Sequence, residues 1–415
     1  MNISKKRDVT DWLFISLMSW YPISGLFNIL FPNTNDNNIY LILSLLFLLV
    51  TISDFRQTRT LKRVFVVLMV WSIYLILYYY HTQYEPAVSL RIMKEYLTVA
   101  KTISHKTFFF VGLAVYVYRN KYRLNLVFQK LLLLGTCMSF ILMAVVFFTQ
   151  GLSFFLEEAV KVEKTSVTLI TMSYNFVLYA TLAIHLICKK EGASKTAAWI
   201  CLIICVISIL FMGKRGPLLS IIGVYGSLYL FANKTWQKSL LYSSIIVLLY
   251  FVIISNINYL FDLMSIFSQR LADQSKLVYY YGDTNGRDVL WEAAIKQISH
   301  GPWFGYYPKL IFVDTMSFAW GMHPHNIFLE SLMTMGIIGS IPFFLLLVYT
   351  LLIKAYPFIV IDGAYRFFGL LLISELIHNC FSGTLYTSWV WPILFVFSFV
   401  SVKDKRLWEI HTSYK

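Results

Sequence analysis

The sequence predicts an all-α integral membrane protein with about twelve transmembrane helices and one large outer loop. Of its 415 residues, 58% are hydrophobic and 13% are charged, which leaves too little polar surface to cover a soluble globule of this size. Apolar runs of roughly 20 residues recur along the chain, and each is long enough to cross a hydrocarbon core as a helix. These runs do not alternate in polarity, so they favour helices over a β-barrel.

The distribution of Lys and Arg predicts the orientation of these segments. Most of the basic residues lie in alternate loops, which we assign to the cytoplasm, and both termini are expected on that side. The first span is expected to be an uncleaved anchor, because no small-residue cleavage site follows it. The chain is therefore expected to form a single polytopic domain over residues 1–415. The basic clusters used for this assignment lie at 5–7, 56–63, 119–123, 189–195 and 234–238.

The expected spans follow from these loops in order. A second span separates the outer segment 33–38 from the inner loop 56–63, and a fourth span ends near residue 118. The stretch 81–106 has apolar and basic residues on opposite helical faces, which is typical of a helix lying in the membrane interface. The other spans are expected at 12–31, 64–80, 126–149, 167–188, 197–212, 218–232, 239–254, 326–354, 366–381 and 385–402.

Charge and cysteine content exclude two other kinds of site. The net charge of +14 reflects the bias of the inner loops, and no long basic run is interleaved with aromatic residues, so nucleic acid is not an expected partner. The five cysteines lie in or at the ends of spans, where a thiol behaves as a small apolar group. Cys201 and Cys205 share a helix face but have no His or carboxylate neighbours in the sequence, so we expect no metal site there.

Two basic elements are expected on the outer side. Lys214 and Arg215 lie in a turn of only five residues between the seventh and eighth spans, where the charge rule disfavours them. The alternative to a functional role is snorkelling to lipid headgroups. The functional interpretation is a phosphate clamp, because a guanidinium binds phosphate oxygens in pairs and stays charged.

The large outer loop, 256–325 between the ninth and tenth spans, is the longest polar interval of the chain. Within it, Gly286 and Arg287 precede a run that is expected to be helical. A helix N-terminus there would present free backbone amides to a phosphate. Trp291 would lie on the same face of this helix as Arg287. The alternative is that Arg287 only pairs with a neighbouring aspartate in a solvated loop. A Gly/Pro-rich turn follows at 300–308.

His325 is the strongest candidate for a general base. It lies at the start of the tenth span, where the positive end of the helix dipole disfavours the protonated ring and leaves a neutral imidazole that can accept a proton. Pro324 disfavours helix at His323, so either His325 or Asn326 is expected to cap the span, and a purely capping histidine is the alternative. Glu375 and His378 are three residues apart in the eleventh span and are expected to form a buried pair or to line the site.

These motifs together resemble the O-antigen ligase and Wzy-type polysaccharide polymerase superfamily. The resemblance rests on four short motifs in the family's order, with a single large outer loop before the histidine. They are Gly213-Lys214-Arg215-Gly216-Pro217, Gly286-Arg287 with Trp291, Gly301-Pro302-Trp303-Phe304-Gly305, and His325-Asn326-Ile327-Phe328-Leu329-Glu330 followed by Gly336 and Gly339.

The resemblance implies a glycosyltransferase of the GT-C type that uses undecaprenyl-diphosphate-linked sugars and needs no metal or other cofactor. It implies that Arg215 and Arg287, with Lys214, hold the diphosphate and that His325 activates the acceptor hydroxyl. The candidate supporting residues are Asn326, Glu330, Trp291, His323, Glu375 and His378.

The resemblance favours a polymerase of lipid-linked repeat units for O-antigen, capsule or exopolysaccharide. The first alternative is a ligase that transfers the glycan to the lipid A core of lipopolysaccharide. The second is a transporter or flippase, but such carriers usually have paired halves, and only the second half of this chain has a long outer loop. The expected location is the bacterial inner membrane, and the expected partners are the lipid bilayer, a chain-length regulator and a flippase.

Overall fold

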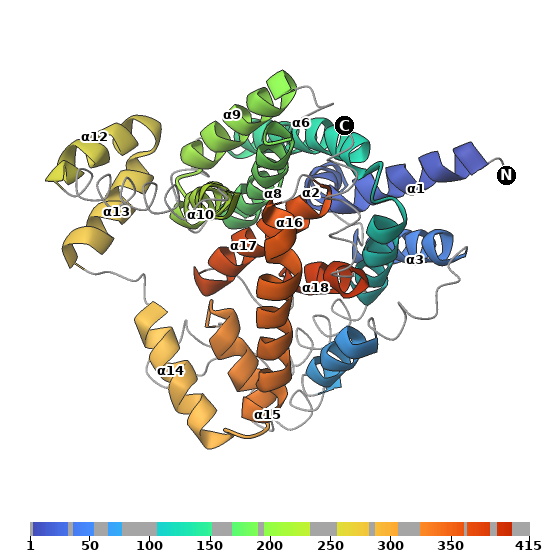
Figure 1. Cartoon of the computed structure of the whole chain (residues 1–415). Coiled ribbons are helices and arrows are strands. Elements are labelled where there is room, and N and C mark those ends of the chain that lie inside the picture. Colours follow the sequence, from blue (N-terminus) through green and yellow to red (C-terminus); the bar gives the residue numbers. More distant parts are fainter. Residues whose placement is uncertain are drawn as a thin grey trace.

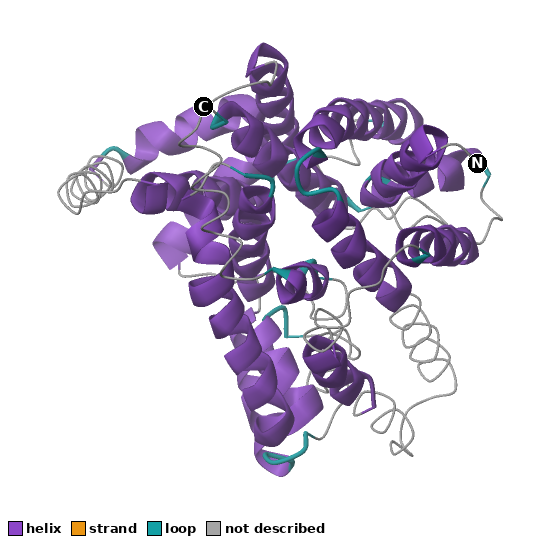
Figure 2. Ribbon diagram, turned by 45° about the vertical axis from the view of Figure 1, so that its right-hand side comes forward, coloured by secondary structure: helices purple, strands orange, loops and turns teal. Residues whose placement is uncertain are grey.

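The computed structural model describes residues 3–31, 36–53, 65–76, 106–151, 168–189, 195–232, 255–281, 287–305, 324–360, 363–381 and 388–400. Within these ranges every regular element is a helix (Figure 2). The predicted interfacial helix at 81–106 and the predicted ninth span at 239–254 lie outside the described residues, apart from residue 106. The all-α prediction is confirmed for the part of the chain that the structure describes.

The helices follow the predicted order along the chain (Figure 1). Two described helices occupy 65–76 and 106–119. The others are α1 (Ile3–Met18), α2 (Trp20–Leu30), α3 (Asp36–Ile52), α6 (Leu124–Gln150), α8 (Leu169–Ile187), α9 (Lys195–Phe211), α10 (Arg215–Ala232), α12 (Ile257–Phe267), α13 (Gln269–Tyr281), α14 (Arg287–His300), α15 (Ile327–Tyr349), the π-helix η1 (Thr350–Ala355), α16 (Tyr356–Val360), α17 (Tyr365–Phe381) and α18 (Val390–Phe399).

By length and composition alone, three helical segments of the described chain could cross a membrane: Leu124–Gln150, Leu169–Ile187 and Ile327–Val360, the last of which is broken at Gly336. The bent pair α1 and α2 would make a fourth span, and several shorter apolar helices accompany them. These features are those of a multi-pass membrane protein. The count of twelve spans stays a prediction, as does the boundary of the outer loop at 256–325.

The first predicted span is wrong as a single straight helix. The chain bends by 71° between α1 and α2, at Ser19. Pro22 explains the break, because its ring cannot donate to the carbonyl of Met18 four residues earlier and would clash with it. Tyr179 donates its hydroxyl to Ser19 Oγ at 3.1 Å, so α8 supports the bend.

The tenth predicted span is also wrong as a single crossing, because α15 folds back on itself. Gly336 has φ 61° and ψ −171°, which is not helical, and it separates two helical legs. The rings of Phe328 and Phe344 lie 5.7 Å apart, whereas 16 residues of straight helix would separate them by about 24 Å. The first leg therefore returns alongside the second, and only the second continues through η1 into α16.

The bend at Gly336 holds the Gly/Pro-rich turn that follows α14. Ile337 and Ile338 begin the second leg, and their N–H groups donate to the carbonyls of Pro302 at 2.8 Å and Trp303 at 3.1 Å. These bonds satisfy donors that a helix start leaves without partners in its own helix. The backbones approach so closely that a Cβ on Gly336 would lie 2.4 Å from the amide nitrogen of Gly305.

Replacing Gly336 with Ala should therefore destabilise the protein by roughly 1–3 kcal/mol, because the new methyl group overlaps backbone and the left-handed φ disfavours any side chain. The measurement is the thermal unfolding midpoint in detergent, together with protease cleavage at the 301–305 turn. Gly226→Ala is the matched control, since a Cβ there would meet no atom within 4 Å. An unchanged midpoint for Gly336→Ala would contradict the docked bend.

Basic side chains close several helix ends at one end of the bundle. Arg119 donates to the carbonyl of Thr51, and Lys354 donates to that of Val400, each at 2.6 Å. Arg366 donates to the carbonyl of Cys188 at 3.2 Å. These carbonyls lie at helix C-termini, where a cation also interacts favourably with the helix dipole. All of these groups lie at helix ends that the charge pattern assigns to the cytoplasm, and the orientation of the termini itself stays a prediction.

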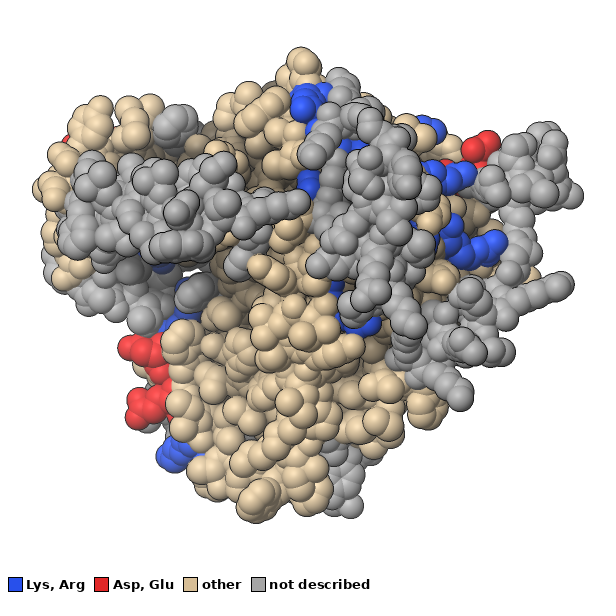
Figure 3. Space-filling view, viewed as in Figure 1, with Lys and Arg blue, Asp and Glu red and all other residues tan. Residues whose placement is uncertain are grey.

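The fold places α14 against the bend-forming helix. Leu290 and Ala294 of α14 form a small buried cluster with Met333 from the first leg of α15. The second leg packs on the main core, where Phe343 lies 5.2 Å from the ring of Trp391. On the face seen in Figure 3, uncharged surface covers α15, and the charged side chains at lower left lie over α14. Arg287, Trp291 and His325 are therefore carried by a helix pair, α14 and α15, that is anchored at its far end by the Gly336 bend.

Candidate functional site

The main predicted site residues lie at helix starts. Arg215 is the first residue of α10, and Arg287 is the first residue of α14. His325 precedes the first residue of α15 by two positions. All three side chains are half-buried. A helix start presents free N–H groups and the positive end of the dipole, so each location favours an anion.

Asn326 caps α15, and His325 does not. The Asn326 side-chain oxygen accepts from the backbone N–H of Phe328 at 3.0 Å and of Leu329 at 3.2 Å. His325 instead has φ 52°, and it is the one non-glycine residue with positive φ among those described. This conformation is uncommon, and strained backbone of this kind is concentrated at functional sites. The expectation of a cap at His325 or Asn326 is confirmed for Asn326, so capping does not explain the histidine.

Trp291 connects α14 to the histidine segment. Its indole Nε1 donates to the carbonyl of Pro324 at 2.9 Å, directly before His325. Trp291 lies four residues after Arg287 and thus on the same face of α14. The predicted helix start at Gly286-Arg287 is confirmed at Arg287. One hydrogen bond therefore connects α14 to the residue that precedes His325.

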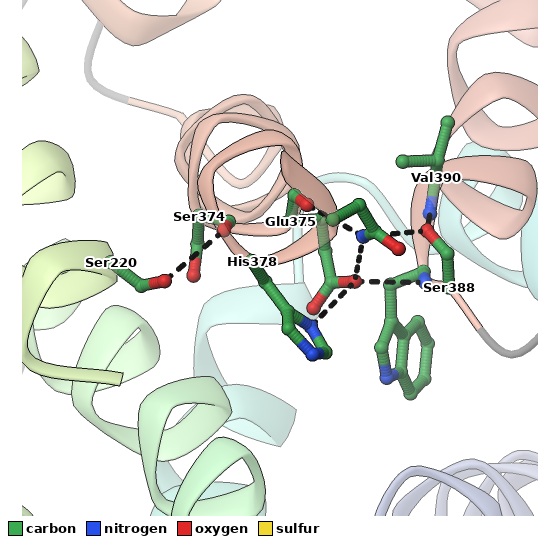
Figure 4. Close-up of polar contacts among 8 residues, drawn as sticks. Ser220, Ser374, Glu375, His378, Ser388 and Val390 are labelled. Atoms are coloured by element: carbon green, nitrogen blue, oxygen red, sulfur yellow. Dashed lines mark hydrogen bonds and ion pairs between the residues drawn. The ribbon is translucent and has the colours of Figure 1, made fainter. Parts of the chain in front are cut away.

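Burial lowers the pKa of Arg287, and an electrostatic interaction with Tyr174 on α8 opposes that effect. Tyr174 belongs to a cluster that joins α8 to α17. The Tyr174 ring stacks on His378 with centroids 3.3 Å apart. His378 Nδ1 lies 3.7 Å from Glu375 Oε2, so the predicted pairing of these two residues on α17 is confirmed (Figure 4).

The Glu375 carboxylate is held by the chain that leads into α18. Its Oε2 accepts from the backbone N–H of Trp389 at 3.1 Å and from Asn379 Nδ2 at 3.2 Å. Asn379 also donates to Ser388 Oγ at 3.0 Å. These bonds compensate a buried negative charge that would otherwise be costly.

The helix that begins at Arg215 reaches the same part of α17. Ser220 Oγ donates to the carbonyl of Ser374 at 3.4 Å, next to Glu375 (Figure 4). Arg215 lies five residues earlier on α10, about 7.5 Å along the helix axis. Gly213 has φ 64°, in the predicted tight turn that carries Lys214 between α9 and α10. The first turns of α10 thus lie against the C-terminal half of α17.

Of the two remaining supporting candidates, the structure describes Glu330 but not His323. Glu330 is fully buried in the first turn of α15, and its backbone N–H donates to the Asn326 carbonyl at 2.9 Å. His323 lies outside the described residues. Within the described ranges no three His, Cys, Asp or Glu side chains gather to hold a metal ion, and the metal-free chemistry implied by the resemblance stays a prediction.

The sequence interpretation missed Tyr174, Asn379 and Ser388. Tyr174 lies in an apolar span with no motif around it, and nothing local distinguishes it from the other tyrosines of the chain. Ser388 and Asn379 are nine residues apart, and a hydrogen bond joins their side chains. The packing of α8 against α17 brings Tyr174 to His378.

The fold is that of a multi-pass membrane protein in which arginines stand at the starts of two helices, α10 and α14. Residues 200–344 match the family model described as Wzy_C, O-Antigen ligase. Residues 200–344 therefore form a Wzy_C O-antigen ligase domain, which is a domain of membrane glycosyltransferases, and this family implies a lipid-linked glycan as substrate. The match includes Lys214, Arg215, Arg287 and His325, whereas Tyr174, Glu375 and His378 lie outside it. A comparison with curated proteins gave no significant match.

Proposed function

We propose that this protein polymerises undecaprenyl-diphosphate-linked repeat units at the outer face of the inner membrane. The observation that carries the proposal is His325: Asn326 takes the capping role, and the histidine adopts a strained conformation beside the segment bound by Trp291. The resemblance of the His325 motif and of the turn at 213–217 to those of capsule and O-antigen polymerases favours polymerase. The description of the matched family favours the ligase as the second candidate.

In the proposed reaction a sugar hydroxyl of the acceptor attacks the anomeric carbon of the donor. The new glycosidic C–O bond forms as the bond to the diphosphate oxygen breaks, and the configuration at the anomeric carbon inverts. His325 accepts the hydroxyl proton, and undecaprenyl diphosphate leaves with its electron pair. Arg215 and Arg287, with Lys214 nearby, balance its charge together with the free amides of the two helix starts.

The supporting residues have positioning roles in this proposal. Trp291 holds the histidine segment through Pro324, and Asn326 orders the first turn of α15. His323 and Glu330 flank this start in sequence. Glu375 and His378 form a buried pair on α17, and the His378 ring stacks on Tyr174. A transporter would not need a base at this location, and the glycosyltransferase family match gives that alternative no support.

The deciding experiment supplies the purified, reconstituted protein with a defined undecaprenyl-diphosphate-linked repeat unit, with or without a lipid A core acceptor. A polymerase should make longer lipid-linked chains without the lipid A core, and His325→Asn should make them far more slowly. Product that forms only as a lipid A conjugate would identify the ligase instead. Unchanged glycan that has crossed the bilayer would overturn both.

A further inference from the structure

The turn that follows α14, residues 301–305, carries two adjacent aromatic side chains that are largely exposed. The exposed fraction is 61% for Trp303 and 62% for Phe304. The backbone of this turn is fixed, because two of its carbonyls accept the N–H groups of Ile337 and Ile338. We call this turn, together with these two isoleucines, the tip of the α14–α15 pair. It lies at the bottom of the molecule in Figure 1, where the end of α14 meets the bend of α15.

The tip continues an apolar stripe on the second leg of α15. The stripe consists of exposed side chains three or four residues apart, which therefore lie on one face of the helix: Ile338, Ile341, Leu345 and Val348. This leg belongs to a segment that is long and apolar enough to cross a membrane. An apolar face that such a segment turns away from the protein faces lipid. Because Ile338 belongs to both the stripe and the tip, Trp303 and Phe304 extend the lipid-facing surface past the start of the leg.

The charged side chains of the pair lie on α14. Asp288, Glu292 and Lys296 recur every four residues along this helix and are exposed. Leu290 and Ala294, between them, pack on α15. In Figure 3 the charged side chains of α14 lie at the edge of the view, and uncharged surface covers α15. A helix pair with a charged side and an apolar side is typical of the boundary between lipid and water.

The residue types at the tip suit the same boundary. Tryptophan has a large apolar ring and an indole N–H that needs a hydrogen-bond acceptor, and it is enriched where membrane spans leave the hydrocarbon core. In water, two neighbouring aromatic rings would expose a large apolar area at a free-energy cost. At the level of the lipid headgroups the rings leave water, and the indole N–H still finds acceptors.

We propose that the tip inserts into the lipid–water interface of the outer leaflet, the side to which the charge pattern assigns the 256–325 loop, and that Trp303 and Phe304 are the inserted side chains. The partner of this exposed surface is phospholipid. The membrane anchor fixes the position of the helix pair that carries Arg287 and His325 relative to the lipid headgroups. The anchor itself does not depend on the proposed reaction, and only its relation to a lipid-linked diphosphate does.

The test places the photoreactive residue p-benzoylphenylalanine at position 303 of the full-length protein, in nanodiscs of phosphatidylethanolamine and phosphatidylglycerol. Irradiation should yield a covalent phospholipid adduct that mass spectrometry detects. The backbone hydrogen bonds of the tip do not involve the replaced side chain, so the variant should keep the fold. Position 304 provides the same test if the first variant is not produced.

Two other positions on the helix pair serve as controls. The same probe in place of Ile341, on the apolar stripe, should form the phospholipid adduct, and in place of Glu292, on the charged side of α14, it should form none. If Ile341 forms the adduct but neither tip position does, the tip stands in water and the anchor is overturned. A cross-link from the tip to a second copy of the protein, or equal lipid labelling at Glu292, would overturn it as well.

The adduct also separates this inference from the proposed polymerase activity, because it forms without turnover. A protein that gives the phospholipid adduct at the tip but makes only lipid A conjugates would retain the anchor and lose the polymerase assignment. A protein that elongates lipid-linked chains but gives no adduct at the tip would do the reverse.

Discussion

His325→Asn should reduce glycosyl transfer by about 10²- to 10⁴-fold while the protein still binds its donor lipid, because a positioned general base contributes about that factor. Asparagine suits this test. It tolerates the left-handed backbone that His325 adopts with φ 52°, so the variant keeps the local conformation and removes only the imidazole. Turnover with a defined lipid-linked glycan and donor binding should be measured on the same preparation.

The controls for His325 separate chemistry from helix initiation. Asn326→Ala removes the cap of α15 and should cost about 0.5–2 kcal/mol of stability, with a smaller effect on turnover per folded molecule. His325→Gln should be as inactive as His325→Asn. Turnover of either variant at the wild-type rate would exclude the histidine as base and direct attention to Glu330 or Glu375.

Arg287→Lys should remain strongly impaired, by at least about tenfold in kcat/KM, because a point ammonium cannot reproduce the paired hydrogen bonds of a guanidinium to a diphosphate. The loss should be larger for Arg287→Ala. Arg215→Lys at the start of α10 should behave in the same way. The measurement is the rate at limiting donor concentration, where binding of the diphosphate in the transition state is expressed.

Lys296→Ala provides the control on the same helix, since this exposed cation of α14 lies more than two turns from Arg287. It should leave kcat/KM unchanged at physiological ionic strength. Full activity of the lysine variants at both 215 and 287 would mean that general positive charge near the headgroups suffices, and the clamp would fail.

Local signals in the sequence predicted local structure well. The start of α14 at Arg287, the cap at Asn326 and the turn at Gly213 all depend on residues within a few positions. Capping side chains, glycines with positive φ and prolines act through the adjacent backbone, so their effects can be read from short windows. The composition likewise determined the all-α membrane class.

The fold-back of α15 was not predictable in this way. Its apolar run reads as one span, because a single glycine is tolerated within a membrane helix. The bend at Gly336 depends on distant partners, the carbonyls of Pro302 and Trp303, which receive the N–H groups freed at the break. Without those acceptors, the same residues would satisfy their donors by continuing the helix.

The sequence by itself determined which residue types stand at the helix starts: Arg215, Arg287 and His325, with Trp291 one turn into α14. Tertiary structure alone decided which buried polar groups of distant helices meet. The stack of Tyr174 on His378 joins α8 to α17 across 204 positions of sequence (378 − 174). Helix caps and turns depend on residues that are neighbours along the chain. The environment of a buried charge depends instead on the helix that packs against it, and this packing follows from the whole fold.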